Sequence, residues 1–419
     1  MAYRPLNKLY YEGQDLYLQT YRARFESEDA VTLSFEIAQH PAFFLQDAEV
    51  MRLAYEIMKL DRAVTRLSAA LPGIAKAQYS KKCLIDEIVL TNRIEGVHSS
   101  RKEIDDALEI LEKQSDEKGK HQRFVGLVHK YLKLLTGEPI PLKTCQDIRA
   151  IYDELFLDEV IAEDPQHAPD GTIFRKGATA VHSAAGKEIH RGLYPESRII
   201  HAMEQALAFL NDESVDKLFR ICIFHYLIEH IHPFYDGNGR LGRFILSCCL
   251  SETLEPLLSY RISETIKENI TGYYRAFEIC NDPRDLGDLT PFLIMMLHMI
   301  RAALRELEGS LTRRSIRWAR YESLVPTFPG ADDIAVRRMY SYLIQAALFS
   351  EKGISTKELE VGFEASYYKV KKLLDRIDPR LLRSEPRGRN KYYQLDLTAL
   401  DEILLRDGLE KSSETSGMG

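Results

Sequence analysis

The segment Phe224–Leu250, FHYLIEHIHPFYDGNGRLGRFILSCCL, places one polar turn between two strongly apolar stretches. The first stretch belongs to VDKLFRICIFHYLIEHI, which is apolar on most sides and predicts a central, buried helix. The second stretch predicts another apolar helix. Pro233 disfavours helical geometry at the residue before it, so the first helix should end at His232. The rest of the chain adds further helices, and we therefore expect a mainly α protein.

The glycines of this turn have no role as a packed core element. Glycine permits positive φ, which lets backbone N–H groups converge on an anion. A helix that begins near Asn238 adds its own N-terminal N–H groups and the positive end of its dipole. Arg240 and Arg243 share one face of its first turn, and arginine binds phosphate oxygens through a planar fork. The turn therefore predicts a site for more than one phosphate.

Two further residues of the turn indicate chemistry rather than binding alone. Phosphates would repel Asp236 unless a cation lay between them, and Mg²⁺ takes a carboxylate together with phosphate oxygens. Asp236 is therefore a candidate magnesium ligand. His232 has an intrinsic pKa near neutrality and is the one proton acceptor available. These residue types together indicate nucleotidyl or phosphoryl transfer with a histidine base.

Other interpretations of the same residues are open. Asp236 alone would serve as a helix N-cap, and Arg240 and Arg243 as solvent-exposed helix arginines. A zinc or iron site would draw on four ligand-type side chains, those of His225, His230, His232 and Asp236. His225 and His230 are five residues apart, which separates them by about 140° around a helix axis. Buried structural histidines are therefore favoured over a metal cluster.

At this point the sequence resembles the Fic family, whose signature is H-x-F-x-[D/E]-G-N-G-R-x-x-R. His232–Arg243 matches every fixed position. The resemblance covers roughly residues 75–305 and implies an α-helical bundle with a β-hairpin flap. It implies AMPylation, in which AMP passes from ATP to a Ser, Thr or Tyr hydroxyl of a target protein. The roles implied by position are a base for His232, a Mg²⁺ ligand for Asp236, an anion nest for Gly237, Asn238 and Gly239, and phosphate clamps for Arg240 and Arg243.

The resemblance extends to two weaker regions. GYYRAFEICN is similar to the family's adenine-side helix, so Tyr274 and Asn281 are candidate adenine contacts; the alternative is a core tyrosine and a helix-capping asparagine. The Gly/Pro-rich stretch 174–195 lies where the family keeps its flap. There Ala180, Val181 and His182 would pair with an extended target segment by strand addition.

A second motif, TNRIEG (Thr91–Gly96), fits the family's inhibitory pattern [S/T]-x-x-x-E-[G/N]. Thr91 and Glu95 are four apart on a helix of about residues 84–96 that Gly96 should end, so both face one way. The resemblance implies that Glu95 pairs with Arg243 and inhibits ATP binding within the chain. The alternative is a surface glutamate near a helix C-cap.

The domain boundaries follow from changes in sequence character. We expect a strand and helix region over 1–74, in which LYYEGQDLYLQTY and AVTLSFEI alternate as strands do. The predicted Fic domain spans 75–311, followed by a polar linker over 312–331, a winged helix over 332–405 and a disordered tail over 406–419. Between Lys369 and Lys391 the chain carries nine basic residues and three acidic ones, so residues 366–391 are a candidate DNA-binding surface; dimerisation or protein contact is the alternative.

Composition bears on the binding partners and the cellular location expected for this protein. A net charge of −7 argues against a general polyanion binder. The six cysteines form no C-x-x-C pair, which is typical of reduced thiols in a cytosolic protein. We see no signal peptide, and FLIMMLHMIRAAL is too short to cross a bilayer, so we expect a cytoplasmic protein without membrane contact. Its partners would be ATP and a target protein, with DNA and a second copy as further possibilities.

Two classes of function follow. The first is a self-inhibited protein adenylyltransferase that uses Mg²⁺. The second is a DNA-binding transcriptional regulator whose Fic body senses a ligand or reacts slowly. Within the first class, the same site would also suit removal of AMP or transfer of another phosphate-containing group.

Overall fold

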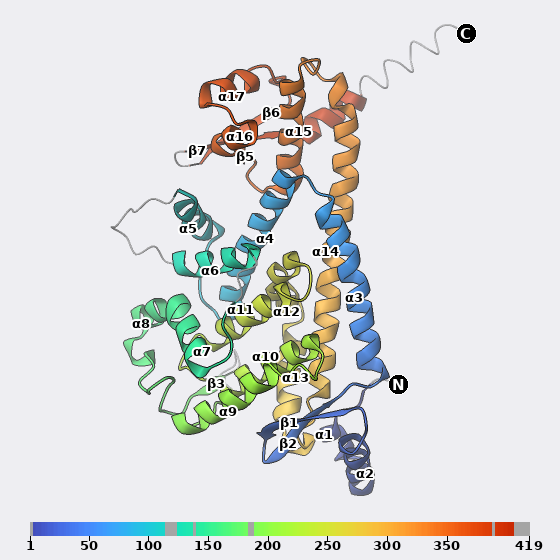
Figure 1. Ribbon diagram of the computed structural model, residues 1–419, viewed down its shortest axis with the longest axis vertical. Coiled ribbons are helices and arrows are strands. Elements are labelled where there is room, and N and C mark those ends of the chain that lie inside the picture. The colour runs from blue at the N-terminus through green and yellow to red at the C-terminus, as the bar shows by residue number, and fades with distance from the viewer. Residues whose placement is uncertain (1–2, 114–123, 137–139, 183–187, 388–389, 406–419) are drawn as a thin grey trace, which may run out of the picture. The chain divides into compact units, whose positions relative to one another are not determined.

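The computed structural model describes residues 3–113, 124–136, 140–182, 188–387 and 390–405, so the predicted tail at 406–419 lies outside it. The chain is mainly helical, as predicted, and divides into two compact units (Figure 1). One unit comprises 1–64 and 83–307, and the other 65–82 and 308–419. These divisions fall within α3 (Ala48–Ala69) and α4 (Gly73–Ile94), whereas the sequence placed a boundary at residue 74, near the start of α4.

The N-terminal region is more helical than its sequence pattern predicted. LYYEGQDLYLQTY (residues 9–21) starts at the last residue of α1 (Leu6–Leu9) and continues into α2 (Gln14–Phe25) instead of forming a strand. AVTLSFEI is the predicted strand β1 (Ala30–Ile37), which pairs antiparallel with β2 (His40–Leu45). Leu6, Leu9 and Tyr17 form one small buried cluster, so the apolar residues meet as helical neighbours and not across a sheet.

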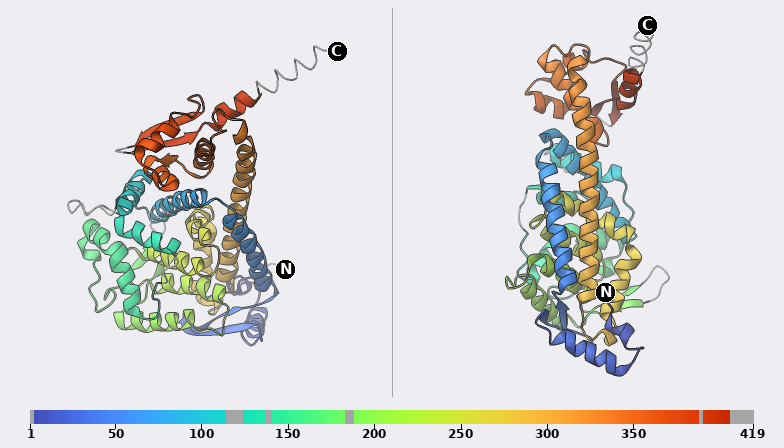
Figure 2. Two further views of the ribbon diagram at one scale, coloured as in Figure 1. Left: turned by 45° about the horizontal axis from the view of Figure 1, so that its top comes forward. Right: turned by 90° about the vertical axis from the view of Figure 1, so that its right-hand side faces the viewer.

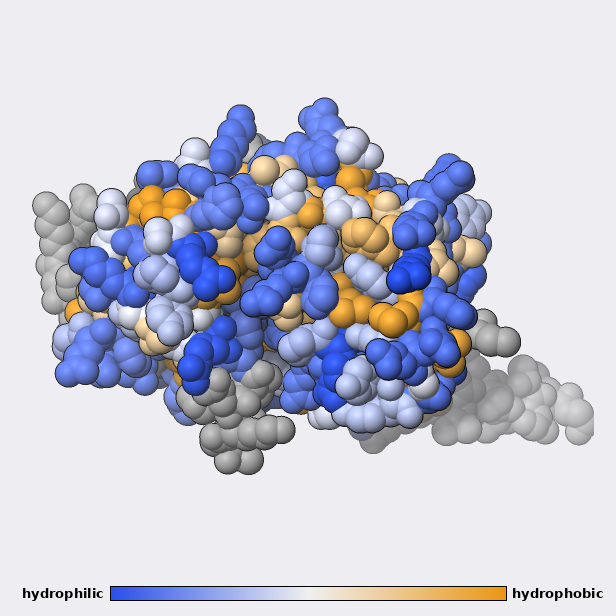
Figure 3. All heavy atoms as spheres, turned by 90° about the horizontal axis from the view of Figure 1, so that it is seen from below, coloured by the Kyte–Doolittle hydropathy of each residue, from blue (hydrophilic) through white to orange (hydrophobic). Residues whose placement is uncertain are grey.

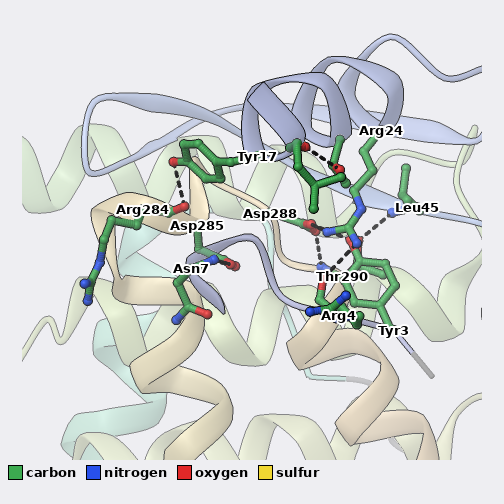
Figure 4. Close-up of polar contacts among 12 residues, drawn as sticks. Tyr3, Arg4, Asn7, Tyr17, Arg24, Leu45, Arg284, Asp285, Asp288 and Thr290 are labelled. Carbon is green, nitrogen blue, oxygen red and sulfur yellow. Dashed lines mark hydrogen bonds and ion pairs between the residues drawn. The ribbon is translucent and has the colours of Figure 1, made fainter. Parts of the chain in front are cut away.

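Buried polar contacts hold this N-terminal arm to the loop that precedes the long helix α14 (Figure 4). The Tyr3 hydroxyl and Arg24 Nη1 both donate to Asp288, the latter at 3.2 Å. The backbone N–H of Asn7 donates to Asp285 Oδ1 at 3.2 Å. Asp288 is fully buried, and burial raises its pKa while Arg24 acts in the opposite direction. Docking of the arm therefore depends on a buried ion pair.

The core of the first unit is built from helices on both sides of the motif. α10 (Lys217–Ile231) is buried almost all round, and it contacts α9 and α11, beside which it lies in the middle of the unit (Figure 1). The Asp216 carboxylate caps its N-terminus by accepting from the N–H of Leu218 at 2.8 Å. The other helices have these bounds: α4 Gly73–Ile94, α5 Arg101–Lys113, α6 Val125–Thr136, α7 Cys145–Tyr152, α8 Asp158–Glu163, α9 Glu196–Leu210, α11 Asn238–Ser251, α12 Ile262–Glu268 and α13 Ile270–Asn281.

Two long helices run side by side along this unit, α3 (Ala48–Ala69) and α14 (Thr290–Leu324) (Figure 2). Glu56 on α3 accepts from Arg301 on α14 at 2.7 Å. The predicted linker over 312–331 is wrong for its first part, because α14 continues to Leu324. The segment LTRRSIRWARYESL contains no proline or glycine, so its arginines lie on a helix and not in a loop.

The second unit contains the elements expected near the C-terminus. They are α15 (Ile334–Phe349), α16 (Thr356–Phe363) and α17 (Tyr367–Leu374), with strands β5 (Ile354–Ser355), β6 (Leu382–Arg387) and β7 (Asn390–Leu395). The strands form one antiparallel sheet in the order β5-β7-β6. Ser355 begins α16 with a capping box to Glu358, which fixes the helix start locally.

The surface at the β1–β2 end of the first unit is mostly hydrophilic, with apolar side chains in separate groups (Figure 3). A groove of about 610 Å³ lies there between β1 and α9. In the part of the chain that the structure describes, no helix combines the length and the apolar character that a bilayer crossing requires.

Candidate functional site

His232 stands at the end of α10, as its sequence position predicted. It is the C-cap residue and adopts left-handed geometry at φ 54° and ψ 63°, with its N–H donating to the carbonyl of Ile228 at 3.0 Å. Burial lowers the pKa of the imidazole to about 3, and the neighbouring His190 and Arg175 act in the same direction. The imidazole is therefore neutral at physiological pH, which is the form that accepts a proton.

Arg175, which the sequence analysis did not single out, holds the backbone around His232. Its side chain is fully buried. It donates to three carbonyl oxygens, those of His232 at 2.9 Å, Leu193 at 2.8 Å and Gly177. A Cβ at Gly192 would lie 2.4 Å from Arg175 Nη2, so this packing requires glycine there. No local pattern marked Arg175, because the same loop holds other polar side chains, among them Thr172 and Lys176.

The loop after His232 is braced by its own side chains. Asn238 accepts from the N–H of Phe234 at 2.9 Å and donates to its carbonyl at 2.8 Å, which closes the turn. Phe234 stacks on Tyr152 of α7 with ring centroids 3.6 Å apart. The side chain of Asn238 therefore shapes the loop, and only its backbone is left for the predicted anion nest.

The start of α11 has the geometry expected of an anion site. Gly237 is the N-cap in left-handed geometry at φ 81°, which favours glycine. Gly239 is helical, and a Cβ there would lie 2.3 Å from Glu95 Oε1. Asp236 is partly exposed at the mouth of the turn, and its Oδ1 accepts from the N–H of Gly237 at 2.6 Å. The helix start thus presents backbone N–H groups beside one carboxylate, and in this structure a glutamate lies against it.

The two residues predicted to inhibit the site meet Arg243. Arg243 Nη2 forms an ion pair with Glu95 Oε1 at 2.7 Å. Its Nε donates to Thr91 Oγ1 at 2.9 Å, and its Nη2 approaches the Thr91 carbonyl at 3.2 Å. α4 ends at Ile94, and Gly96 follows with φ 75°, so the predicted helix end is confirmed. Both residues of the stretch predicted to be inhibitory therefore contact the guanidinium of Arg243.

Two further carboxyl groups near Arg243 were missed. Burial raises the pKa of Glu229 to about 8, with Arg243 opposing and Glu95 reinforcing the shift. Burial thus favours the neutral form of the Glu229 carboxyl, while Glu95 forms the ion pair with Arg243. Burial also raises the pKa of Glu87 to about 7, and Glu87 accepts from the Ser263 hydroxyl at 2.6 Å. The spacing of Glu87, four residues before Thr91 on the same helix, was a usable signal.

The two adenine-side candidates lie about two turns apart on α13 and have different surroundings. Burial raises the pKa of Tyr274 to about 12, and the charge of Glu95 contributes, which places Tyr274 near the site. The side-chain oxygen of Asn281 accepts from the Tyr226 hydroxyl at 2.6 Å and contacts His230 Nδ1 at 2.7 Å. Asn281 therefore ties α13 to α10, in line with a structural role.

The predicted flap has the backbone of a hairpin. β3 (Ala180–His182) pairs antiparallel with β4 (Glu188–Arg191), with Ala180 opposite Arg191 and Val181 opposite His190. The side chains of Val181 and His182 lie outside the described residues. Gly192 donates to the Thr179 carbonyl at 3.1 Å, so the hairpin continues toward Arg175 and His232.

The metal alternatives differ in how well the residues suit them. Within the described ranges no group of three His, Cys, Asp or Glu side chains is arranged to hold a metal. His225 contacts the Tyr273 hydroxyl at 2.7 Å, and His230 contacts Asn281, so both serve the core. The single carboxylate of Asp236 suits a magnesium ion whose remaining ligands come from phosphate and water.

The site thus joins the imidazole of His232, the glycine-capped start of α11 and two arginines within one turn. Residues 143–250 match the model of the Fic/DOC family, and the chain therefore contains a Fic domain. A Fic family protein from Desulfovibrio desulfuricans G20 shares the fold, with a TM-score of 0.51 at 20% identity over 83% of this chain and 96% of that one.

Relatives with an assigned activity match over shorter stretches. The protein adenylyltransferase fic-1 of Caenorhabditis elegans is 30% identical over 120 residues, which is 28% of this chain and 22% of that protein. A probable protein adenylyltransferase of Aquifex aeolicus (strain VF5) is 50% identical over 42 residues, 10% of this chain and 13% of that protein. The chain thus spans about a fifth or less of the length of these relatives.

Proposed function

We propose that this protein is a protein adenylyltransferase that transfers AMP from ATP to a hydroxyl group of a protein, and that Glu95 inhibits it. The observation that carries the proposal is the position of His232 at the C-cap of α10, five residues before Gly237, the N-cap of the helix that bears Arg240 and Arg243. The names of the matching relatives support the same activity. Composition and the six buried cysteines favour the cytoplasm as its location.

The proposed chemistry assigns one role to each part of the turn. The N–H groups at Gly237, Asn238 and Gly239 hold phosphate oxygens, and Arg240 and Arg243 hold the β- and γ-phosphates. His232 accepts the proton of the target hydroxyl, whose oxygen then attacks the α-phosphorus. The bond between the α-phosphorus and the bridging oxygen breaks, and pyrophosphate leaves. Asp236 would hold Mg²⁺, which supplies charge neutralisation between the phosphates when bound.

The test is transfer of label from α-³²P-ATP to protein in a cell lysate, with Glu95→Gly protein as the active form. We expect labelled proteins, identified by mass spectrometry, and no labelling with Glu95→Gly/His232→Ala. Equal labelling by both variants would refute the role of His232. Labelling from γ-³²P-ATP instead of α-³²P-ATP would indicate a different phosphate transfer.

A second function, DNA binding by the second unit, is favoured by the surface of α17. We infer that this unit is a winged helix, because a short strand, two helices and a hairpin follow α15 in that order. α17 carries three exposed lysines and the tyrosines Tyr367 and Tyr368, which are 56% and 65% exposed. The lysines are Lys369, Lys371 and Lys372. Clustered cations on a recognition helix suit DNA phosphates.

The strand hairpin contributes less to this surface than its sequence predicted. Arg383 pairs with Asp396, and Arg387 with Glu385. A gel shift of the full chain should therefore weaken with salt, and Lys371→Ala/Lys372→Ala should reduce both the affinity and the salt dependence. An unchanged shift with that variant would remove α17 from the interface, and no shift at low salt would refute DNA binding.

A further inference from the structure

Arg240 is held in a different way from Arg243. Its side chain is 1% exposed, and its Nη1 donates to Glu159 Oε2 at 2.9 Å. The carboxylate of Glu159 is 14% exposed, so the pair is shielded from water. The guanidinium lies over the ring of Phe156, 5.0 Å from the ring centre. One side of Arg240 is therefore fixed by a carboxylate and an aromatic ring.

The other side of Arg240 is not used. Within the described part of the chain, Nε and Nη2 are buried and have no hydrogen-bond partner. Buried donors without an acceptor are rare in folded proteins and indicate a missing partner. Nε and Nη2 form the edge of a guanidinium that binds two oxygens of one phosphate side by side. Arg240 is thus fixed through Nη1, while its Nε–Nη2 edge has no partner among the described residues.

Arg243 provides the contrast within the same helix turn. Its Nε and Nη2 are both engaged, by Thr91 and Glu95. The inhibitory stretch therefore occupies the same edge that is open on Arg240. A carboxylate on Nη1 does not compete with phosphate for that edge, whereas one on the Nε–Nη2 edge does.

We propose that Glu159 is a positioning residue that orients Arg240 for the phosphate chain of ATP. This inference rests on the proposed function. Glu159 contacts no reacting atom, and it acts by fixing the plane of the guanidinium, so that Nε and Nη2 are presented when nucleotide binds. The free energy of ordering a long arginine side chain is then spent on folding and not on binding.

The segment that carries Glu159 also contacts the turn at His232–Arg243 through two aromatic side chains. α7 passes into one π-helical turn (Asp153–Leu157) and then into α8, and such turns place side chains differently from a regular helix. Tyr152 stacks on Phe234 of the turn, and Phe156 lies under Arg240. Glu159 completes the set, with residues at spacings of four and three. One segment therefore fixes both the loop and the arginine.

The experiment compares variants in the Glu95→Gly background, where Arg243 is free. Glu159→Ala should weaken binding of ATP about tenfold, while binding of AMP, which lacks the β- and γ-phosphates, should stay within about twofold. Glu159→Gln keeps an acceptor oxygen and should recover most of the affinity. Glu163→Gln, at the exposed end of the same helix, is the matched control. Transfer kinetics should show a raised KM for ATP with a smaller change in kcat.

Three results would overturn the proposal. The first is that Glu159→Ala binds ATP as tightly as the Glu95→Gly background protein does. The second is that binding of ATP and binding of AMP are weakened equally, which would indicate general damage to the fold. The third is increased transfer by Glu159→Gln with Glu95 intact, which would make Glu159 a second inhibitor. If Glu159→Ala does not fold, the comparison is made with Glu159→Gln, for which a small loss of about two- to threefold in ATP affinity is expected, and unchanged ATP binding would contradict the proposal. If Glu95→Gly protein transfers no AMP, the proposed function fails, while the comparison of ATP binding with AMP binding by the Glu159 variants still tests the role of Glu159.

Discussion

Replacing Glu95 by glycine should raise the affinity for ATP by about one to two orders of magnitude. In the structure Glu95 holds Arg243 at 2.7 Å, and the arginine is 1% exposed while the glutamate is 30% exposed. A hydrogen bond to a charged group contributes about 1.5–3 kcal/mol, and about 1.4 kcal/mol corresponds to a factor of ten. The carboxylate also lies against Gly239, where an anion would bind, so like-charge repulsion adds to the effect.

The substitution should leave the fold intact, because Glu95 follows the last residue of α4 and glycine costs little there. Isothermal titration with ATP and magnesium measures the change directly, and α-³²P-ATP measures the gain in transfer. Glu95→Gln, which keeps the shape and loses the charge, should give a smaller gain. Glu278→Gln, an exposed charge on α13, should give none. The reasoning is refuted if folded Glu95→Gly binds ATP no more tightly than wild type.

Three further outcomes are expected. In Glu95→Gly protein, kcat/KM should not fall between about pH 7.5 and 6 through protonation of His232, because burial lowers its pKa to about 3 and the base stays neutral; a fall centred near 6.5 would contradict this. Arg175→Lys should lower the free energy of unfolding by about 2 kcal/mol or more and reduce transfer, since one ammonium does not span three carbonyls. If the free energy of unfolding measured in urea is unchanged, Arg175 does not brace the backbone around His232. Arg24→Ala should cost about 3 kcal/mol by leaving buried Asp288 unpaired, seen as faster proteolysis within residues 3–25, whereas exposed Arg22→Ala should behave as wild type.

The sequence determined the features that depend on neighbouring residues. Pro233 and the glycines predicted where α10 ends and α11 begins, because these residues restrict or release backbone angles locally. The same holds for Gly96, which follows α4 in left-handed geometry. The mainly α class followed from apolar spacing. The pairing of Glu95 with Arg243 was expected from a resemblance, and the structure places the two residues in contact.

The alternation of apolar and polar residues predicted a strand wrongly where few side chains are buried. Most of the side chains of α2 are exposed or half-buried, and Tyr17 is its one fully buried residue, so the pattern of its tyrosines and leucines did not report helix or strand. The linker expected over 312–331 failed for a related reason. A run of arginines on an exposed helix face has the composition of a loop, and composition does not show whether the backbone is helical.

Only the tertiary structure decided which distant groups meet. Arg175 reaches the carbonyl of His232, 57 residues away, and Glu159 reaches Arg240, 81 residues away. Nothing near Glu159 in the sequence marks it, because a glutamate on a short helix is ordinarily a surface residue. Its proposed role, and the shifted pKa values of His232 and Glu229, arise from burial, and burial is a property of the packed chain and not of any local pattern.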